Sequence, residues 1–334
     1  MSISPGALRF NTDSQKLELY DGNQWTEIVA SSPDSQTGGA RGVFGNVSPG
    51  YSNVLEYITI STTGNSADFG DLIRISGNQA AMCASSTRGL HGGGIIAPAA
   101  AFTNSIEYIT ISSTGNAADF GDLSGAKRYL SALSNSTRGI FAGAAGGVEN
   151  VIEYVTIAST GDARDFGDLT SAKGITATFG SSTRGIISGG EGPVSALNVI
   201  DFITISTTGN AADFGDLTLV RQGSAGCSNS TRGIIAGGYS YPSTPSVTYN
   251  VIDYISITVL GNAIDFGDLT VARSSNVGGC SSPTRGIFAG GGTFPGASNV
   301  IDYITIMSIG NAIDFGDLSA TSDPAACSNG HGGL

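Results

Sequence analysis

From residue 41 onwards, short apolar runs alternate with stretches rich in glycine, serine and asparagine. One of these runs, Val-Ile-Asp-Tyr-Ile-Thr-Ile at residues 300–306, is rich in the β-branched and aromatic residues that favour strands. Its apolar side chains occupy both alternations, as expected for a strand sandwiched between neighbouring sheets. No segment of a dozen residues shows the 3.6-residue apolar period of a helix. The pattern therefore predicts an all-β protein.

Three sequence markers recur in the same order along the chain, each in six copies. The first is Arg-Gly followed by two mostly apolar residues, and it begins at Arg41, Arg88, Arg138, Arg184, Arg232 and Arg285. The second is an Asn-Val-Ile-Asp-Tyr-Ile-Thr-Ile pattern, which begins at Asn150, Asn198, Asn250 and Asn299 and, more loosely, at Asn53 and Asn104. The third is Asp-Phe-Gly-Asp-Leu, which begins at Asp68, Asp119, Asp165, Asp213, Asp265 and Asp314. Successive copies of the third marker begin 46 to 52 residues apart, and a period of this length indicates a repeat architecture.

Each repeat contains four predicted strands. Residues 225–228 typify the first strand, and the Arg-Gly run forms the second, which ends in glycines such as Gly290 and Gly291. The other two markers form the third and fourth strands, and a Gly-Asn turn precedes the fourth. Four strands per repeat are typical of a propeller blade. A β-solenoid, which would use shorter coils and fewer turns, is the second choice.

The two ends of the repeat region indicate that it closes into a ring. No convincing first strand precedes Arg41, whereas residues 325–329 after the last repeat match residues 225–229. The C-terminus would then supply the innermost strand of the first blade and cover edges that are otherwise exposed. We therefore expect a six-bladed β-propeller over residues 41–334, closed by a C-terminal strand. A linker at residues 31–40 and a small β-hairpin module at residues 1–30 precede it.

The order of elements in residues 41–329 resembles the kelch repeat, with an apolar strand ending in Gly-Gly, a Tyr-containing strand and an aromatic-bearing fourth strand. The sequence departs from kelch in the first repeat, where Asn46-Val47 replaces the glycine pair, and in the third, where Gly143-Ala144 does. Phenylalanine also stands where kelch blades usually carry tryptophan, at Phe69, Phe120, Phe166, Phe214, Phe266 and Phe315. The resemblance implies a binding scaffold more often than a catalyst.

The net charge of −12 argues against nucleic acid as a partner, because affinity for that polymer comes mainly from Lys and Arg. It also disfavours an anionic membrane surface. No apolar run is long enough for a transmembrane helix, and the first residues lack the basic and apolar regions of a signal peptide. We therefore expect no membrane insertion and folding in a cytosol.

Most charges recur in every repeat, which favours a structural role. The six Arg-Gly arginines recur, as do basic residues at Lys127, Lys173, Arg221 and Arg273 and the acids Glu56, Glu107, Glu153, Asp201, Asp253 and Asp302. The sequence predicts a ring of Arg–carboxylate pairs that tie adjacent strands or blades. Calcium held by the Asp-Phe-Gly-Asp carboxylates is the alternative, but their spacing is wrong for an EF-hand loop. We expect no metal site.

The four cysteines and two histidines do not indicate catalysis or a cofactor. Cys83, Cys227 and Cys280 occupy equivalent places in different repeats, as does Cys327, so we expect buried free thiols rather than disulfides. His91 replaces a core residue of the other repeats, and His331 lies near the C-terminus. The sequence contains no nucleophile elbow or phosphate-binding loop in a strand–helix context. We predict a protein that is not an enzyme and binds no cofactor.

Candidate ligand-binding residues lie where the repeats differ, in the segments between the glycine pair and the third strand. These six segments should emerge on one face of the ring, and aromatic residues in or beside them are good anchors for glycan or protein contacts. The candidates are Tyr51, Phe102, Tyr239, Tyr241, Tyr249 and Phe294. Local packing that holds long loops in place is nearly as good an explanation.

Residues 1–30 do not follow the repeat, and they cannot bury enough surface to be stable alone. Their Leu-Arg-Phe-Asn-Thr and Lys-Leu-Glu-Leu-Tyr-Asp-Gly segments resemble modules of bacteriophage tail-fibre and virion structural proteins. The resemblance implies attachment to other virion proteins, for which Phe10, Tyr20 and Trp25 are candidates, and a homotrimer is one arrangement. The predicted function is a virion protein that binds a host-surface glycan or protein. A cellular kelch-like adaptor that binds a protein partner is the alternative.

Overall fold

The computed structural model describes Ser4 and residues 6–11, 16–27, 40–76, 79–145, 148–242, 247–274, 277–293 and 296–334. The chain divides into two compact units, Met1–Gly38 and Gly39–Leu334. The first unit contains a three-stranded antiparallel sheet of β1 (Leu8–Asn11), β2 (Lys16–Tyr20) and β3 (Trp25–Glu27). The predicted linker at residues 31–40 lies outside the described residues, apart from Ala40.

The second unit contains four sets of equivalent strands. The innermost strands are β7 (Ala81–Ala84), β12 (Ser131–Ser134), β16 (Ala177–Gly180), β20 (Ala225–Ser228), β24 (Gly278–Ser281) and β30 (Ala325–Ser328). The second strands are β4 (Arg41–Gly45), β8 (Arg88–Gly92), β13 (Arg138–Ala144), β17 (Arg184–Ser188), β21 (Arg232–Ala236) and β25 (Arg285–Ala289). The third strands are β5 (Ser52–Thr59), β10 (Ala101–Thr110), β14 (Glu149–Thr156), β18 (Val199–Thr204), β22 (Val251–Ser256) and β28 (Val300–Thr305). The outer strands are β6 (Ala67–Ser76), β11 (Ala118–Lys127), β15 (Arg164–Asp168), β19 (Ala212–Asp216), β23 (Ile264–Asp268) and β29 (Ile313–Asp317).

These strands form antiparallel sheets, which we call repeats 1 to 6 after their order in the sequence. Repeats 3 to 6 are separate four-stranded sheets, ordered from innermost to outer strand. Repeats 1 and 2 are joined through β9 (Ile95–Ile96) into one nine-stranded, nearly barrel-shaped sheet. A short hairpin of β26 (Gly292–Thr293) and β27 (Gly296–Ala297) belongs to repeat 6. An all-β fold of small sheets, with no helix among the described residues, fits a β-propeller generally.

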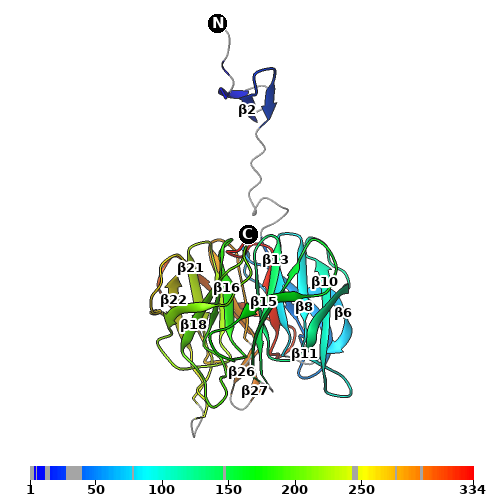
Figure 1. Cartoon of the computed structure of the whole chain (residues 1–334), viewed down its shortest axis with the longest axis vertical. Helices are drawn as coiled ribbons and strands as arrows, with labels where there is room; N and C mark the ends of the chain where they lie inside the picture. Colours follow the sequence, from blue (N-terminus) through cyan, green and yellow to red (C-terminus); the bar gives the residue numbers. More distant parts are fainter. Residues whose placement is uncertain are drawn as a thin grey trace. The chain divides into compact units, whose positions relative to one another are not determined.

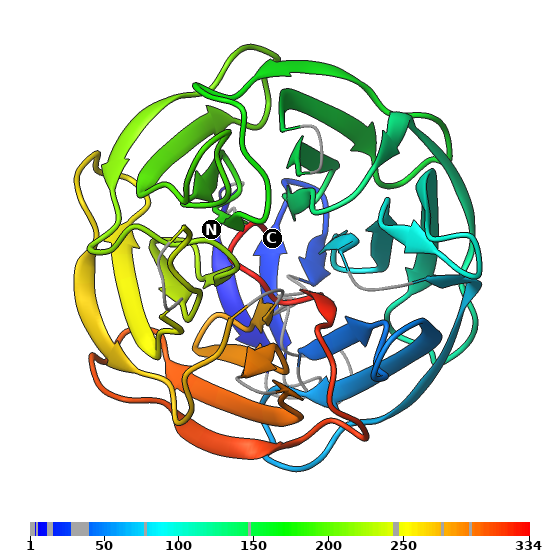
Figure 2. The ribbon, with the colours of Figure 1, turned by 90° about the horizontal axis from the view of Figure 1, so that it is seen from below.

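The innermost strands lie side by side in a closed circle, in the order β7, β12, β16, β20, β24, β30 and back to β7. Figure 2, which looks along the axis of this circle, shows the sheets arranged around it. The C-terminal strand β30 pairs with β4, with Cys327 opposite Val43, so the last strand in the sequence completes the first repeat. This pairing follows the sequence prediction.

Serine hydroxyls link several pairs of neighbouring innermost strands around the circle. Ser281 Oγ donates to the Ser228 carbonyl at 2.8 Å and accepts from the Ser228 amide at 3.4 Å. Ser328 binds Ser281 in the same way, and Ser134 binds Ala84. Each hydroxyl satisfies a donor and an acceptor that would otherwise be unpaired on a strand edge, which explains the serine that ends these strands.

The turn before each outer strand, Gly-Asn in five repeats and Gly161-Asp162 in repeat 3, lies against the outer strand of the preceding repeat. The Gly115 amide donates to the Phe69 carbonyl at 2.7 Å, and Asn116 Oδ1 accepts from the Asp71 amide at 3.1 Å. The glycine of Asp-Phe-Gly-Asp makes this approach feasible. Gly121 has a φ of +147°, and a Cβ there would lie 2.5 Å from the Gly161 carbonyl oxygen. The recurring motif therefore forms a contact between repeats.

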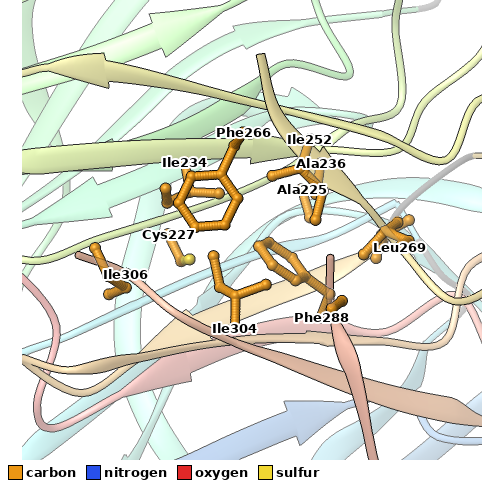
Figure 3. Packing of buried hydrophobic residues seen from close by; sticks show 12 residues of the cluster. Ala225, Cys227, Ile234, Ala236, Ile252, Phe266, Leu269, Phe288, Ile304 and Ile306 are labelled. Atoms are coloured by element: carbon orange, nitrogen blue, oxygen red, sulfur yellow. The ribbon is translucent and has the colours of Figure 1, made fainter. Parts of the chain in front are cut away.

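Apolar cores lie between neighbouring sheets, and each of six buried clusters combines residues of two adjacent repeats. Figure 3 shows the cluster between repeats 5 and 6, where Phe266, Ile234 and Cys227 pack near Phe288 and Ile304. This arrangement explains why the third strand is apolar on both alternations, because it is covered on both faces.

The four cysteines are buried and free, as predicted, and they lie on the innermost strands. Burial raises the pKa of the Cys83 thiol to about 12 and raises those of Cys227, Cys280 and Cys327 well above their usual range. A thiol that stays protonated is a poor nucleophile. These residues therefore act as small apolar side chains in the core.

We expect the folded protein at pH 8 to resist a thiol reagent such as Ellman's reagent, and all four thiols to react in denaturant. Because the unfolded thiols ionise at about pH 8.5, their contribution to stability should be constant below that pH and fall as the pH rises above it. Absorbance titration and thermal melts at pH 7 and 9.5 would measure these effects. Rapid labelling of the folded protein would contradict the buried positions.

Candidate functional site

The connections between second and third strands leave the sheets at one end of the ring, which we call the loop end. In Figure 1 the hairpin of β26 and β27 marks this end, and the C-terminus lies at the opposite end. Three of the predicted aromatic residues are exposed at this end, with Tyr51 46% and Tyr241 50% exposed in the connections and Phe102 40% exposed at the start of β10. Phe102 lies under the guanidinium of Arg128, whose Cζ is 4.7 Å from the ring centroid.

The other predicted ligand residues have different environments. Tyr249 is half-buried, and its amide donates to the Gly238 carbonyl at 2.8 Å. Phe294 lies outside the described residues. Tyr239 follows the glycine pair of repeat 5, and its hydroxyl accepts a hydrogen bond from Gln222 Nε2. The described members of the predicted set therefore do not form one cluster. Tyr239 takes part in the site described below, and Phe102 contacts it through Arg128.

The residues two positions before the innermost strands surround one mouth of the ring axis. Backbone hydrogen bonds link them in sequence, from the Tyr129 amide to the Gln79 carbonyl, from Ile175 to Tyr129 and from Gly223 to Ile175, at 2.7 to 3.0 Å. All four have a positive φ, between 53° and 85°. That conformation is costly for the β-branched Ile175 and persists only where the surrounding structure enforces it. Asp323 holds the equivalent place in repeat 1.

A cavity of about 100 Å³ lies on the axis beneath this mouth, lined by the first residues of the innermost strands. Ser131, Thr176, Thr178 and Ser224 contribute hydroxyls to its wall. Ser131 Oγ donates to the Thr176 carbonyl at 2.9 Å, and Thr178 Oγ1 to the Ala132 carbonyl at 2.7 Å. A polar cavity of this size holds several water molecules or the polar end of a ligand.

Phenol, carboxylate and guanidinium groups gather at the mouth. The backbone of Glu191 pairs with that of Gly174, next to Ile175, and the backbone of Tyr239 pairs with that of Gln222, next to Gly223. Burial raises the pKa of the Tyr129 phenol, and Tyr239, Asp323 and Glu191 act in the same direction, while Arg128 opposes them. The Arg128 Cζ lies 5.4 Å from the centroid of the Tyr129 ring. These groups come from four different repeats, and the ring brings them within electrostatic range of one another. We call these five residues the axial cluster.

Two buried polar atoms beside the axial cluster have no hydrogen-bond partner among the described residues. They are Oε1 of Gln222, a residue only 3% exposed, and Nε of Arg128. The Gln222 amide nitrogen is held by the Tyr239 hydroxyl, which places the amide group beside the mouth. Buried polar atoms are nearly always paired, so an unpaired acceptor and an unpaired donor at one mouth indicate room for an external partner.

The opposite end of the axis is closed by the C-terminal tail. His331 Nε2 lies 2.7 Å from the Ala84 carbonyl, and the Gly332 amide donates to the Ser228 carbonyl at 3.0 Å. A smaller cavity of about 50 Å³ lies beneath His331. Burial lowers the pKa of His331. The tail is therefore packed against the strands, so the loop end is the accessible end of the axis.

Among the described residues, the six Arg-Gly arginines have no carboxylate partner, contrary to the Arg–carboxylate pairs that the sequence predicts. Arg232 Nη1 donates to the Ile306 carbonyl of the next repeat at 3.0 Å, and its Cζ lies 4.5 Å from the Tyr254 ring centroid. The corresponding contacts recur for Arg41, Arg88, Arg138, Arg184 and Arg285. These arginines tie adjacent repeats through a carbonyl and an aromatic ring.

Because no carboxylate among the described residues is left unpaired, Arg232→Ala should cost about 2–4 kcal/mol of stability, the sum of one charged hydrogen bond and one cation–π contact. Arg232→Lys should cost less, since it keeps the charge. Urea denaturation, followed by far-UV circular dichroism, would measure the loss of stability in both variants. If Arg232→Ala lowered the free energy of unfolding as much as Arg221→Ala, which breaks a buried ion pair, Arg232 would have an additional acidic partner.

The expected carboxylate pairs form instead at the other recurring basic position. Lys173 Nζ lies 3.1 Å from Asp201 Oδ2, and Arg221 Nη2 lies 2.9 Å from Asp253 Oδ2, with all four side chains fully buried. Pairs of the same kind join Lys127 to Glu153 and Arg273 to Asp302. In repeat 1, Ser76 holds this position, and Arg74, two residues earlier and 41% exposed, pairs with Glu107. Burial lowers the pKa of the Lys173 ammonium, and the Asp201 carboxylate opposes that shift.

The junction between repeats 6 and 1 differs from the five junctions that these ion pairs join. Ser322 takes the place of the basic residue, and Glu56 accepts hydrogen bonds from the hydroxyls of Ser66 and Ser319 and from the Ser319 amide at 3.2 Å. Among the described residues, Glu56 has no ion-pair partner. The closing junction is therefore held by neutral donors.

In the first unit, two of the predicted attachment residues pack on each other. The Tyr20 and Trp25 rings are 5.3 Å apart, and the Arg9 guanidinium lies 4.2 Å above the Trp25 ring. Arg9 Nε also pairs with Glu18 Oε2 at 2.8 Å. Phe10 lies on β1, opposite Leu17, and its side chain is outside the described part. Leu8 and Leu19 leave apolar surface exposed on this unit.

Sequence reasoning missed Tyr129, Glu191, Asp323 and Gln222. Their signal was variation between repeats two or three positions before the innermost strand and directly after the glycine pair. Within the described ranges, no group of three or more His, Cys, Asp or Glu side chains could hold a metal ion. No helix in the described part of the chain is long and apolar enough to cross a membrane.

The chain was compared with known proteins. No model of a known protein family matches the chain, and no curated protein is significantly similar to it.

Proposed function

We propose that residues 41–334 form a six-bladed, kelch-like β-propeller that serves as a binding module and not as an enzyme. The circle of innermost strands, the pairing of β30 with β4 and the six inter-repeat cores support this proposal. The axial cluster is the observation that carries it. Positions that hold the scaffold together recur in every repeat, whereas the mouth carries different side chains from each repeat, as a ligand site requires.

The protein acts, in this proposal, as a structural component of a bacteriophage virion. The resemblance of residues 1–30 to modules of tail-fibre and virion proteins supports this role. The first unit attaches the chain to other virion proteins, through Tyr20, Trp25 and Phe10, and the propeller presents its loop end to a host-surface ligand. The apolar surface at Leu8 and Leu19 of this small unit is consistent with attachment.

Mass spectrometry of purified phage particles tests the virion role. We expect the chain in the particles, and we expect its loss from them when residues 1–30 are deleted. A Trp25→Ala variant should be retained less well than a Tyr51→Ala variant, which changes an aromatic residue of the other unit. Absence from the particles, together with a monomer in light scattering, would favour a cellular adaptor instead.

A further inference from the structure

The axial cluster combines hydrogen-bond donors, hydrogen-bond acceptors and aromatic rings in a small space. Glu191 and Asp323 supply acceptors, Arg128 supplies donors, and Tyr129 and Tyr239 supply both hydroxyls and ring faces. The unpaired Gln222 Oε1 and Arg128 Nε add one further acceptor and one further donor. The polar cavity beneath the mouth continues this surface along the axis.

This composition selects among ligand classes. Two carboxylates at the mouth, in a chain of net charge −12, oppose phosphate, sulfate and sialic acid. The hydroxyls of Thr178 and Ser224 donate to carbonyls but keep acceptor lone pairs on the cavity wall, and a purely apolar ligand would leave these lone pairs without a donor. A neutral sugar presents closely spaced hydroxyls, each of which both donates and accepts, and an apolar ring face that packs on tyrosine.

We infer that the axial mouth binds the terminal residue of a neutral oligosaccharide. This inference rests on the proposed binding function and names its ligand class. The carboxylate of Glu191 and the Gln222 Oε1 accept from sugar hydroxyls, Arg128 donates to a sugar oxygen, and Tyr129 or Tyr239 covers the ring. The size of the cavity limits the ligand to a chain end, so a branched or internal residue is excluded.

The first experiment applies the full-length protein to an array of neutral hexose and N-acetylhexosamine oligosaccharides, printed beside sialylated and sulfated ones. We expect binding to neutral probes alone. Binding only to anionic probes, or to no probe at all, overturns the inference. Detection of the chain in virions together with a blank array would reject the sugar and leave the virion role intact, so the two failures are distinguishable.

The second experiment uses calorimetry with the strongest neutral probe. Glu191→Gln removes a charged acceptor, and Tyr239→Phe removes the hydroxyl that holds the Gln222 amide in place. Each should weaken binding about tenfold, the usual effect of removing one charged or buried hydrogen bond. Asp162→Asn is the matched control, because it also turns a carboxylate into an amide, and asparagine holds the equivalent turn position at Asn116. Its affinity should be unchanged.

Thermal melting of each variant verifies that the ring is folded. If Glu191→Gln and Tyr239→Phe bind the sugar as tightly as the unmodified protein, the axial mouth is not the site. If Tyr51→Ala weakens sugar binding and Glu191→Gln does not, the site lies on the outer loops instead.

Discussion

Deletion of residues 325–334 is expected to abolish the cooperative unfolding transition of the ring unit. These residues contain β30, which pairs with β4 and lies beside β24 and β7. Their loss removes Cys327 from the core and Ser328 from its bonds to Ser281. It also exposes the edge of β4 to water and to other chains. Thermal melting by circular dichroism, together with light scattering for aggregation, measures the effect.

Deletion of residues 1–38 is the control for this truncation. It removes the other compact unit and none of the strands of the ring, so the transition should remain. If the chain without residues 325–334 kept its transition at the same temperature, β30 would not be needed for closure, and the propeller proposal would lose its main support.

Arg221→Ala should destabilise the protein by about 3–5 kcal/mol, because it leaves a buried carboxylate without its cation. Arg221 and Asp253 are both fully buried, and the pair joins adjacent repeats. Asp253 keeps its hydrogen bonds from Thr218, at 2.7 Å for the hydroxyl, but these are neutral donors. Burial lowers the pKa of Arg221, and the Asp253 carboxylate opposes that shift. Denaturant unfolding measures the loss.

The repeats themselves supply the control for this variant. Lysine occupies the position of Arg221 in repeats 2 and 3, as Lys127 and Lys173, where it pairs with the equivalent acid. Arg221→Lys should therefore retain most of the stability. Equal unfolding midpoints for the alanine and lysine variants would show that the charge pair contributes nothing to the junction.

Much of the fold could be predicted from the sequence because each repeat carries its own local instructions. The β-branched third strand, the Gly-Asn turn and the Arg-Gly run specify strands and turns from neighbouring residues alone. The match between residues 325–329 and 225–229 was sufficient to predict how the chain closes. The four cysteines could be placed in the core because they replace apolar residues at one position.

The partners of charged residues could not be predicted in the same way. Arg232 and Arg221 both stand at basic positions that recur along the sequence, yet Arg232 reaches a carbonyl and a ring, whereas Arg221 reaches Asp253. The difference depends on the side of the sheet and the neighbouring repeat that each side chain faces. Those relations arise only when sheets pack against one another.

The sequence by itself determined the strands, the number of repeats and the closing segment, because those depend on apolar periodicity, turn residues and recurrence. Only the tertiary structure decided which residues form the axial cluster. Four of its members are Tyr129, Glu191, Tyr239 and Asp323, and 194 positions separate the first from the last in the chain. They meet because the circle of strands brings one end of every repeat to the same axis. No local sequence pattern encodes which side chains lie close together across that axis, because their proximity arises only when the ring closes.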